Sequence, residues 1–124
     1  MEKKIKLHPV LTCKLDDSVH VISKKLKENK ERRIFVIDNT GKLKGIITTT
    51  DLVYKVVAEE NLGKTAKDIM TKEVASIDVS EDIEKALEIM NKLESFVCPI
   101  TDKGKIIGLV SYHDLVGNIL SSLK

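Results

Sequence analysis

Apolar residues recur along the chain with two different spacings, one typical of strands and one typical of helices. Short apolar runs over 10–15, 34–37 and 43–48 predict strands, and a Gly-containing turn between the last two predicts a β-hairpin. Apolar residues three to four positions apart predict a helix that follows Ser18, a residue type that caps helices. The stripe on that helix consists of Val19, Ile22 and Leu26. Another helix is predicted over about 51–58.

The same order of elements is predicted again in the second half. A strand over 74–79 leads into a helix that Ser80 caps, a hairpin joins 97–100 to 106–111, and a last helix covers about 114–123. The helix after Ser80 has an apolar stripe of Ile83, Ala86, Leu87, Met90 and Leu93. Strand, helix, hairpin and helix therefore occur twice.

The duplication is visible in the residues themselves. Residues 41–53 align with residues 104–116 at an offset of 63, with both glycines, a lysine, the aspartate and a Leu-Val pair in common. We interpret residues 1–62 as a first repeat and 63–124 as a second, with a Thr-x-x-Asp capping box over 65–68 that opens a short helix. A unit of about 60 residues is marginally stable alone, so we expect both repeats to pack sheet to sheet as one compact α+β (mixed α/β) module.

Composition narrows the class of protein. The 124 residues are 42% hydrophobic and 32% charged, which supplies enough apolar material for a core and argues against disorder. No stretch approaches the ~20 apolar residues of a membrane span, and no apolar segment of about 7 to 15 residues follows the charged start, so we expect a cytoplasmic protein. Lysine, glutamate and isoleucine are abundant, a bias typical of proteins from hot environments.

Charge and reactive residues argue against several chemistries. A net charge of +2, with two Phe, two Tyr and no Trp, does not favour nucleic acid as a ligand. Cys13 and Cys98 belong to no Cys-x-x-Cys pair, and His8, His20 and His113 lack partners at metal-ligand spacing, so no metal site is expected. No Gly-x-x-x-x-Gly-Lys-Ser/Thr phosphate loop is present, and we do not expect an enzyme.

The most informative recurring pattern is Gly-apolar-apolar-Thr/Ser-x-x-Asp. It occurs as Gly45, Thr48 and Asp51 and again as Gly108, Ser111 and Asp114, each time where a predicted strand ends and a predicted helix begins. A hydroxyl and the free N–H groups of a helix start suit a phosphate, and a carboxylate three residues later can accept hydrogen bonds from a diol. The set suits a phosphorylated ribose, although the same residues can also serve only to cap the helix.

Together these segments resemble the cystathionine β-synthase (CBS) domain family, present as a tandem pair of the Bateman type. The resemblance lies in residues 45–52 and 108–115, with support from 68–71 and 99–102, and it covers almost the whole chain. It implies two pseudo-symmetric repeats with two clefts. In many members these clefts bind adenosine derivatives such as AMP, ADP, ATP or S-adenosylmethionine.

The resemblance also implies roles for individual residues. The aspartate of each motif would accept hydrogen bonds from the ribose hydroxyls, and the Thr or Ser would lie near the phosphate or ribose. These roles would fall on Asp51 with Thr48, and on Asp114 with Ser111.

The first strand of the opposite repeat would complete each cleft. Thr12 would then belong to the Asp114 cleft and Ser76 to the Asp51 cleft. The adenine would meet apolar walls that otherwise serve the core, namely Val10, Ile46, Ile47, Val74, Leu109 and Val110.

Phosphate contacts would differ between the repeats. Arg32 and Arg33 stand where nucleotide-binding relatives often carry a phosphate-contacting arginine, whereas Phe96 and Val97 take those positions in the second repeat. The arginines can equally form a solvated loop face. We therefore expect unequal clefts and favour the Asp114 cleft.

The resulting hypothesis is a regulatory sensor without chemistry of its own. It binds an adenosine derivative, forms a homodimer and signals to a regulated partner protein that the sequence does not identify. A purely structural module with empty clefts and a nucleic-acid-binding module are the alternatives. The helix residues Leu52, Val56, Leu115 and Ile119 would form either the dimer interface or internal core.

Overall fold

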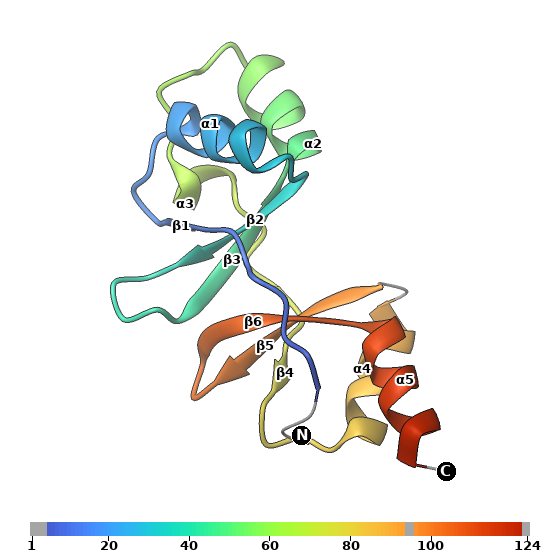
Figure 1. The fold of residues 1–124 in the computed structure, drawn as a ribbon. Coiled ribbons are helices and arrows are strands. Elements are labelled where there is room, and N and C mark those ends of the chain that lie inside the picture. Colours follow the sequence, from blue (N-terminus) through green and yellow to red (C-terminus); the bar gives the residue numbers. More distant parts are fainter. Residues whose placement is uncertain (1–4, 94–95, 123–124) are drawn as a thin grey trace. The chain divides into compact units, whose positions relative to one another are not determined.

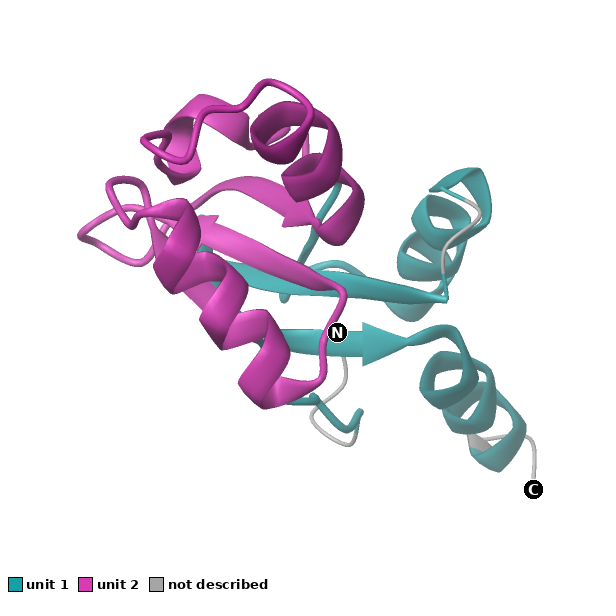
Figure 2. Cartoon of the chain, turned by 90° about the horizontal axis from the view of Figure 1, so that it is seen from above, with its two compact units in different colours: residues 1–10, 75–124 teal, residues 11–74 magenta. Residues whose placement is uncertain are grey.

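The structure, a computed structural model, describes residues 5–93 and 96–122 (Figure 1). The chain divides into two compact units, one of residues 11–74 and one of residues 1–10 together with 75–124 (Figure 2). Each unit contains a three-stranded sheet and helices. The predicted mixed α/β class with two repeats is therefore confirmed.

The 11–74 unit has a mixed sheet in the order β1-β2-β3. Its elements are β1 (Thr12–Lys14), α1 (Val19–Asn29), β2 (Arg33–Ile37), β3 (Leu43–Thr48), α2 (Thr49–Leu52), the π-helix η1 (Val53–Val57) and α3 (Ala66–Ile69). β1 lies parallel to β2, and β2 lies antiparallel to β3 in the predicted hairpin. The parallel strands β1 and β2 are therefore connected by a crossover through α1, and β2 and β3 are connected by a hairpin.

The capping residues and the apolar stripe of helix α1 explain where it begins and ends and which face it buries. The Ser18 hydroxyl accepts a hydrogen bond from the Val21 N–H (3.2 Å), and Lys30 in the left-handed region ends the helix. The predicted stripe is buried in a core with residues from β2 and β3. The buried members of this core are Cys13, Val19, Ile22, Leu26, Ile34, Val36, Ile47, Val56, Ala66 and Ile69.

The second unit has the same strand order, β4-β5-β6. Its elements are β4 (Ile77–Asp78), α4 (Ile83–Leu93), β5 (Val97–Asp102), β6 (Lys105–Ser111) and α5 (Tyr112–Ser122). The β5–β6 turn is tighter than its counterpart because Lys103 (φ 52°) and Gly104 (φ 85°) both adopt positive φ. The core consists of Ile5, Ile77, Ala86, Met90, Cys98, Ile100, Val110 and Leu115.

Two local predictions need correction, and one alternative that the sequence left open is settled. Ser80 does not cap α4: Asp82 does, because its Oδ1 accepts from the Lys85 N–H (2.8 Å), while the Ser80 hydroxyl donates to Asp78. Val56 and Leu115 are buried in the two cores, which excludes them from an exposed dimer interface. The helix predicted from Asp51 begins two residues earlier, at Thr49.

Each sheet is covered at one edge by a segment that precedes the other repeat in the sequence. We call residues 5–10 and 65–74 the lead segments. Thr71 exchanges two backbone hydrogen bonds with Ile46 of β3 (2.9 and 3.0 Å), and His8 does the same with Leu109 of β6 (2.9 and 2.7 Å). The predicted short helix, α3, lies in the 65–74 lead segment and so belongs to the unit of the first sheet.

The compact units therefore differ from the sequence repeats 1–62 and 63–124. Each unit includes the lead segment that the sequence assigns to the other repeat. The repeat boundaries stay a prediction. In residues 5–93 and 96–122, no helix is both long enough and apolar enough to cross a bilayer.

Candidate functional site

In the 11–74 unit, the motif residues meet at the junction of β3 and α2. The Asp51 N–H donates to Thr48 Oγ1 (3.2 Å), and the Thr48 N–H donates to Asp51 Oδ2 (2.9 Å). This reciprocal pair satisfies two N–H groups that the start of a helix leaves free. The capping interpretation is therefore confirmed for this copy. We call Thr48 and Asp51 the Asp51 junction.

A lysine neutralises the carboxylate of the Asp51 junction. Lys55 Nζ lies 3.1 Å from Asp51 Oδ1 and also donates to the carbonyl of Ile69 (2.8 Å). The side chain of Asp51 is 16% exposed, so water screens this pair only in part. Both oxygens of Asp51 are thus engaged within its own unit.

In the other unit, the corresponding residues meet at the junction of β6 and α5. The Asp114 N–H donates to Ser111 Oγ (3.0 Å), and Ser111 Oγ donates to Asp114 Oδ2 (2.8 Å). We call Ser111 and Asp114 the Asp114 junction. It repeats the strand-to-helix geometry of the first copy, with a serine hydroxyl as the N-cap.

A histidine from the lead segment completes the Asp114 junction. His8 Nε2 lies 2.5 Å from Asp114 Oδ2, with side chains 39% and 24% exposed. The hydrogen bonds from His8 and Ser111 lower the pKa of Asp114. The carboxylate is therefore ionised at neutral pH and accepts two hydrogen bonds on one oxygen.

The sequence interpretation did not include His8 or Lys55 in the site. His8 reaches Asp114 because its backbone pairs with Leu109 across 101 positions, a contact that no local pattern reports. Thr71 takes the position of His8 because it pairs with Ile46 as His8 pairs with Leu109, and the offset of 63 places Asn118 at the position of Lys55. Lys55 could have been found, since it follows Asp51 by four residues in a predicted helix.

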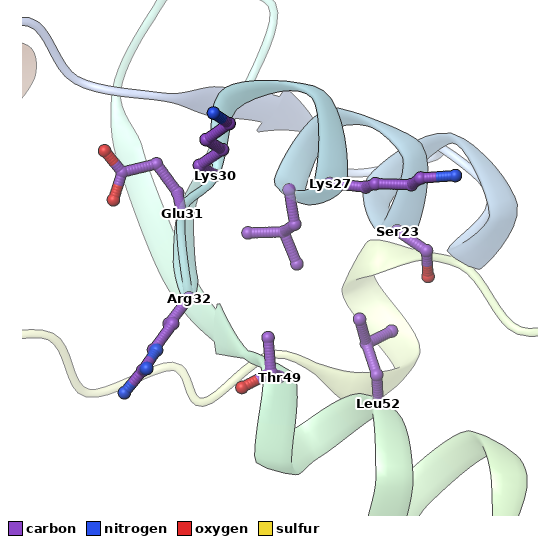
Figure 3. A pocket seen from close by; sticks show the side chains of 8 residues that line it. Ser23, Lys27, Lys30, Glu31, Arg32, Thr49 and Leu52 are labelled. Atoms are coloured by element: carbon purple, nitrogen blue, oxygen red, sulfur yellow. The ribbon is translucent and has the colours of Figure 1, made fainter.

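The structure separates the two candidate arginines. Arg33 begins β2 directly opposite Thr48 of β3, so these two residues share a face of the sheet next to the Asp51 junction. Arg32 instead lines a shallow groove of about 380 Å³ between α1 and α2. In Figure 3 the charged ends of Lys27, Lys30 and Arg32 point away from this groove in different directions, which does not form an anion site.

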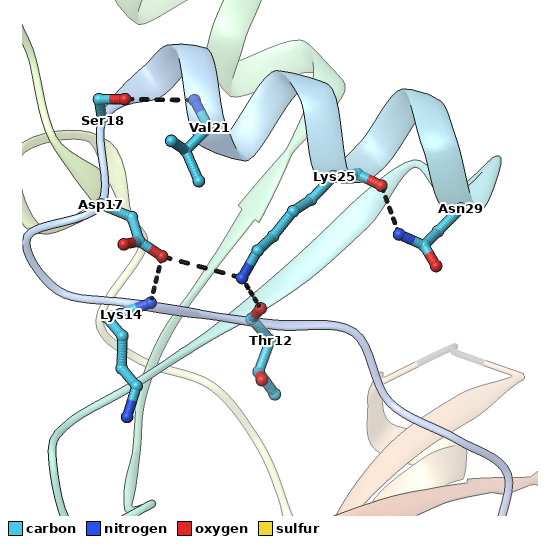
Figure 4. Close-up of polar contacts among 7 residues, drawn as sticks. All are labelled: Thr12, Lys14, Asp17, Ser18, Val21, Lys25 and Asn29. Carbon is cyan, nitrogen blue, oxygen red and sulfur yellow. Dashed lines mark hydrogen bonds and ion pairs between the residues drawn. The ribbon is translucent and has the colours of Figure 1, made fainter.

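Thr12 and Ser76 occupy matching places in the two units. Thr12 lies in β1 opposite Phe35, and its carbonyl accepts from Lys25 Nζ (3.0 Å) while its side chain points away from α1 (Figure 4). Ser76 is half-buried directly before β4. The predicted pairing of Thr12 with Asp114, and of Ser76 with Asp51, joins residues of different units and stays a prediction.

Of the remaining candidates, two apolar wall residues and both cysteines are part of the packing, while Val10, Ile46, Val74 and Leu109 are half-buried. Ile47 and Val110, proposed as adenine walls, are fully buried in the two cores. Burial raises the pKa of Cys13 to about 12 and that of Cys98 to about 11, so both thiols stay protonated and unreactive near neutral pH. Among the residues that the structure describes, no three His, Cys, Asp or Glu side chains are grouped to hold a metal ion.

Comparison with known protein families matches the CBS domain at residues 3–58 and again at 66–121. The two matches cover most of the chain and coincide with the duplicated strand-to-helix junctions. The chain therefore belongs to the CBS domain family and carries two copies of the domain.

Individual relatives support this assignment over most of the chain. Inosine-5'-monophosphate dehydrogenase of Methanocaldococcus jannaschii is 31% identical over 91% of this chain, which spans only 22% of that enzyme. A CBS domain-containing protein of Dictyostelium discoideum is 29% identical over 98% of this chain and 92% of its own length. The solved structure of CBSX2 in complex with AMP has the same fold, with a TM-score of 0.73, 24% identity and 95% of each chain covered.

Proposed function

We propose that this chain is a regulatory module that binds an adenosine derivative through the carboxylates of its two junctions. The observation that carries the proposal is the duplicated geometry itself. Each unit places a partly exposed carboxylate beside a hydroxyl at the start of a helix. Such a set offers an acceptor for a ribose diol. The CBSX2 structure, which contains AMP, supports this class of ligand.

The Asp114 junction is the stronger half of the proposal. Lys55 already neutralises Asp51, and Thr48 occupies the second oxygen of that carboxylate. Asp114, in contrast, pairs with the ring of His8. Because Lys55 is also held by the Ile69 carbonyl, Asp114 is the carboxylate that a ligand can more readily recruit.

The proposal assigns no reaction to the chain. Ligand binding would instead favour the conformation that holds the ligand, and so change the contacts of the module with a second copy or with a regulated partner. We propose a homodimer as the working assembly. Light scattering at several protein concentrations, with and without ligand, measures this directly.

Thermal unfolding against AMP, ADP, ATP and S-adenosylmethionine tests the ligand class. A ligand at about 100 times its Kd should stabilise the chain by about 2.7 kcal/mol, which corresponds to a shift on the order of 10 °C. Inorganic phosphate, which lacks the ribose diol, is the control for nonspecific phosphate binding. Calorimetry on each compound that shifts the transition then gives the stoichiometry.

The outcomes separate the competing functions. A shift with adenosine compounds and none with inorganic phosphate supports the sensor. No shift with any of them overturns it in favour of the structural module. Equal shifts with inorganic phosphate and the adenosine compounds would point to nonspecific anion binding, and tight salt-dependent RNA binding in a parallel assay would point to nucleic-acid binding.

A further inference from the structure

We infer that Lys55 hinders ligand binding at Asp51, so that the Asp114 junction fills first and the Asp51 junction only at a higher ligand concentration. The inference rests on the proposed function, because it assumes a ligand whose ribose diol donates to these carboxylates. One side chain then sets the order of filling, and the chain responds to its ligand in two concentration steps.

Both oxygens of the Asp51 carboxylate already have partners. Lys55 Nζ lies 3.1 Å from Oδ1, and the Thr48 N–H donates to Oδ2 (2.9 Å). The Thr48 contact is part of the helix cap and stays in place when a ligand binds. A ligand hydroxyl that donates to Oδ1 must therefore share this oxygen with the ammonium of Lys55 or displace the ammonium.

Lys55 is held in place by two further contacts, which raises the cost of displacing it. Its ammonium also donates to the Ile69 carbonyl in the 65–74 lead segment (2.8 Å). Its backbone carbonyl accepts from Lys64 Nζ (2.8 Å), which fixes the part of η1 that carries the side chain. A ligand that moves Lys55 away from Asp51 therefore has to break a hydrogen bond to the lead segment as well as an ion pair.

The Asp114 carboxylate has one oxygen available to a ligand. His8 Nε2 (2.5 Å) and Ser111 Oγ (2.8 Å) both lie at Oδ2. Within residues 5–93 and 96–122, no hydrogen bond or ion pair reaches Oδ1 of Asp114, and its side chain is 24% exposed. A carboxylate oxygen has two lone pairs, so Oδ1 can accept from a diol while Oδ2 keeps both of its partners. Binding at this junction displaces no partner of the carboxylate.

The difference between the junctions lies at one position of the repeat. Lys55 corresponds to Asn118 at the offset of 63, and each follows the aspartate of its motif by four residues. Residues four apart are neighbours on a helix, so both side chains lie on the same helix face as the carboxylate. Asn118 is half-buried in α5, and its uncharged amide cannot form an ion pair with Asp114. Exchanging the residue types at these two positions should therefore exchange the order in which the junctions fill.

Adenosine is the probe that isolates this effect, because it carries the ribose diol and no phosphate that a lysine could attract. In an NMR titration of the full chain, the Asp51 and Asp114 amides report the two junctions separately, since each donates to a capping hydroxyl. We expect the Asp114 amide to reach its midpoint at the lower adenosine concentration. K55N should tighten binding at Asp51, and N118K should weaken binding at Asp114, each by about 5-fold, the upper end for a partly exposed ion pair.

Two further variants separate the charge of Lys55 from other effects. K55R keeps a cation beside Asp51 and should leave this junction second in the order of filling. K24N is the matched control, because Lys24 pairs with Glu28 four residues along α1 (4.0 Å). This variant removes one charge and one helical ion pair without touching either junction, and it should change neither midpoint.

The outcomes distinguish the role of Lys55 from the proposed function. An unchanged Asp51 midpoint in K55N, or the same gain in K55R or K24N, overturns the role of Lys55 even though adenosine binds. If K55N does not fold, N118K decides, and an unchanged Asp114 midpoint overturns the role. Adenosine that shifts neither amide while AMP binds places recognition outside the ribose diol and overturns it too. Failure of both adenosine and AMP to bind the unmodified chain overturns the proposed function instead.

Discussion

Asp114→Asn is expected to weaken AMP binding by about 10- to 150-fold, which corresponds to the loss of one hydrogen bond to a charged group. Asparagine keeps the shape of the side chain and can still accept from Ser111, so the start of α5 is retained. It loses the negative charge and one of the two acceptor oxygens that a diol requires. Titration calorimetry at pH 7.5 measures the change in Kd.

The chain contains its own control for this substitution. Thr65 and Asp68 at the start of α3 repeat the Thr-x-x-Asp geometry, with the Thr65 N–H donating to Asp68 Oδ2 (2.9 Å), yet they lie outside the duplicated motif. Asp68→Asn should lower the stability only slightly, because asparagine can still accept from the Thr65 N–H, and it should leave AMP affinity unchanged. If Asp68→Asn and Asp114→Asn weaken binding equally, the aspartate of the motif is a cap and not a ligand contact.

The elements and most of both cores could be predicted because each residue choice agrees with the fold on a local scale, although Leu93, predicted on the apolar stripe of α4, is 42% exposed. The stripe of Val19, Ile22 and Leu26 has a helical period, and Ser18 caps the helix it precedes. The two hairpins follow from apolar runs on either side of a glycine turn. Ser80 and Asp82 were harder to separate, since both are good caps two residues apart and only the position of the first helical turn decides between them.

The motif residues of the candidate site could be predicted from the sequence, but the residues that contact them could not. Thr48, Asp51, Ser111 and Asp114 meet as their spacing requires, because residues three apart at a helix start touch. The contact of His8 with Asp114 depends on which sheet edge the lead segment covers. The alternation of residues along one segment does not indicate which strand the segment pairs with. Pairing between distant segments can therefore not be predicted from a single sequence.

The glycine of the motif is required by close packing and not by a turn conformation, as Gly45 shows. Its φ lies outside the positive range that favours glycine, so its backbone conformation does not require it. A Cβ at this position would lie 2.7 Å from Met70 Sδ and 2.9 Å from the Thr71 carbonyl oxygen. Gly108 faces the other lead segment in the same way, with Leu7 Cβ at 3.0 Å. Each glycine makes room for the segment that covers its strand.

Gly45→Ala is therefore expected to destabilise the chain by about 1–3 kcal/mol, the usual range for overpacking. Urea unfolding should show a lower midpoint with an unchanged slope, and the Ile46 amide, which donates to Thr71, should exchange faster with solvent. Gly108→Ala should be milder because its contacts are longer. Gly117→Ala is the control: a Cβ there meets nothing within 4 Å, and alanine should add about 0.5–1 kcal/mol to helix α5.

A double-mutant cycle identifies the atoms responsible. Met70→Ala removes the flexible Sδ and Cγ contacts but leaves the Thr71 carbonyl in place, so Gly45→Ala should cost less in that background without becoming neutral. Complete relief by Met70→Ala would assign the clash to the side chain alone. A neutral Gly45→Ala in the unmodified chain would contradict the close approach of the lead segment to β3. Because His8 reaches Asp114 through the equivalent approach at β6, that result would also weaken the case for the His8 contact.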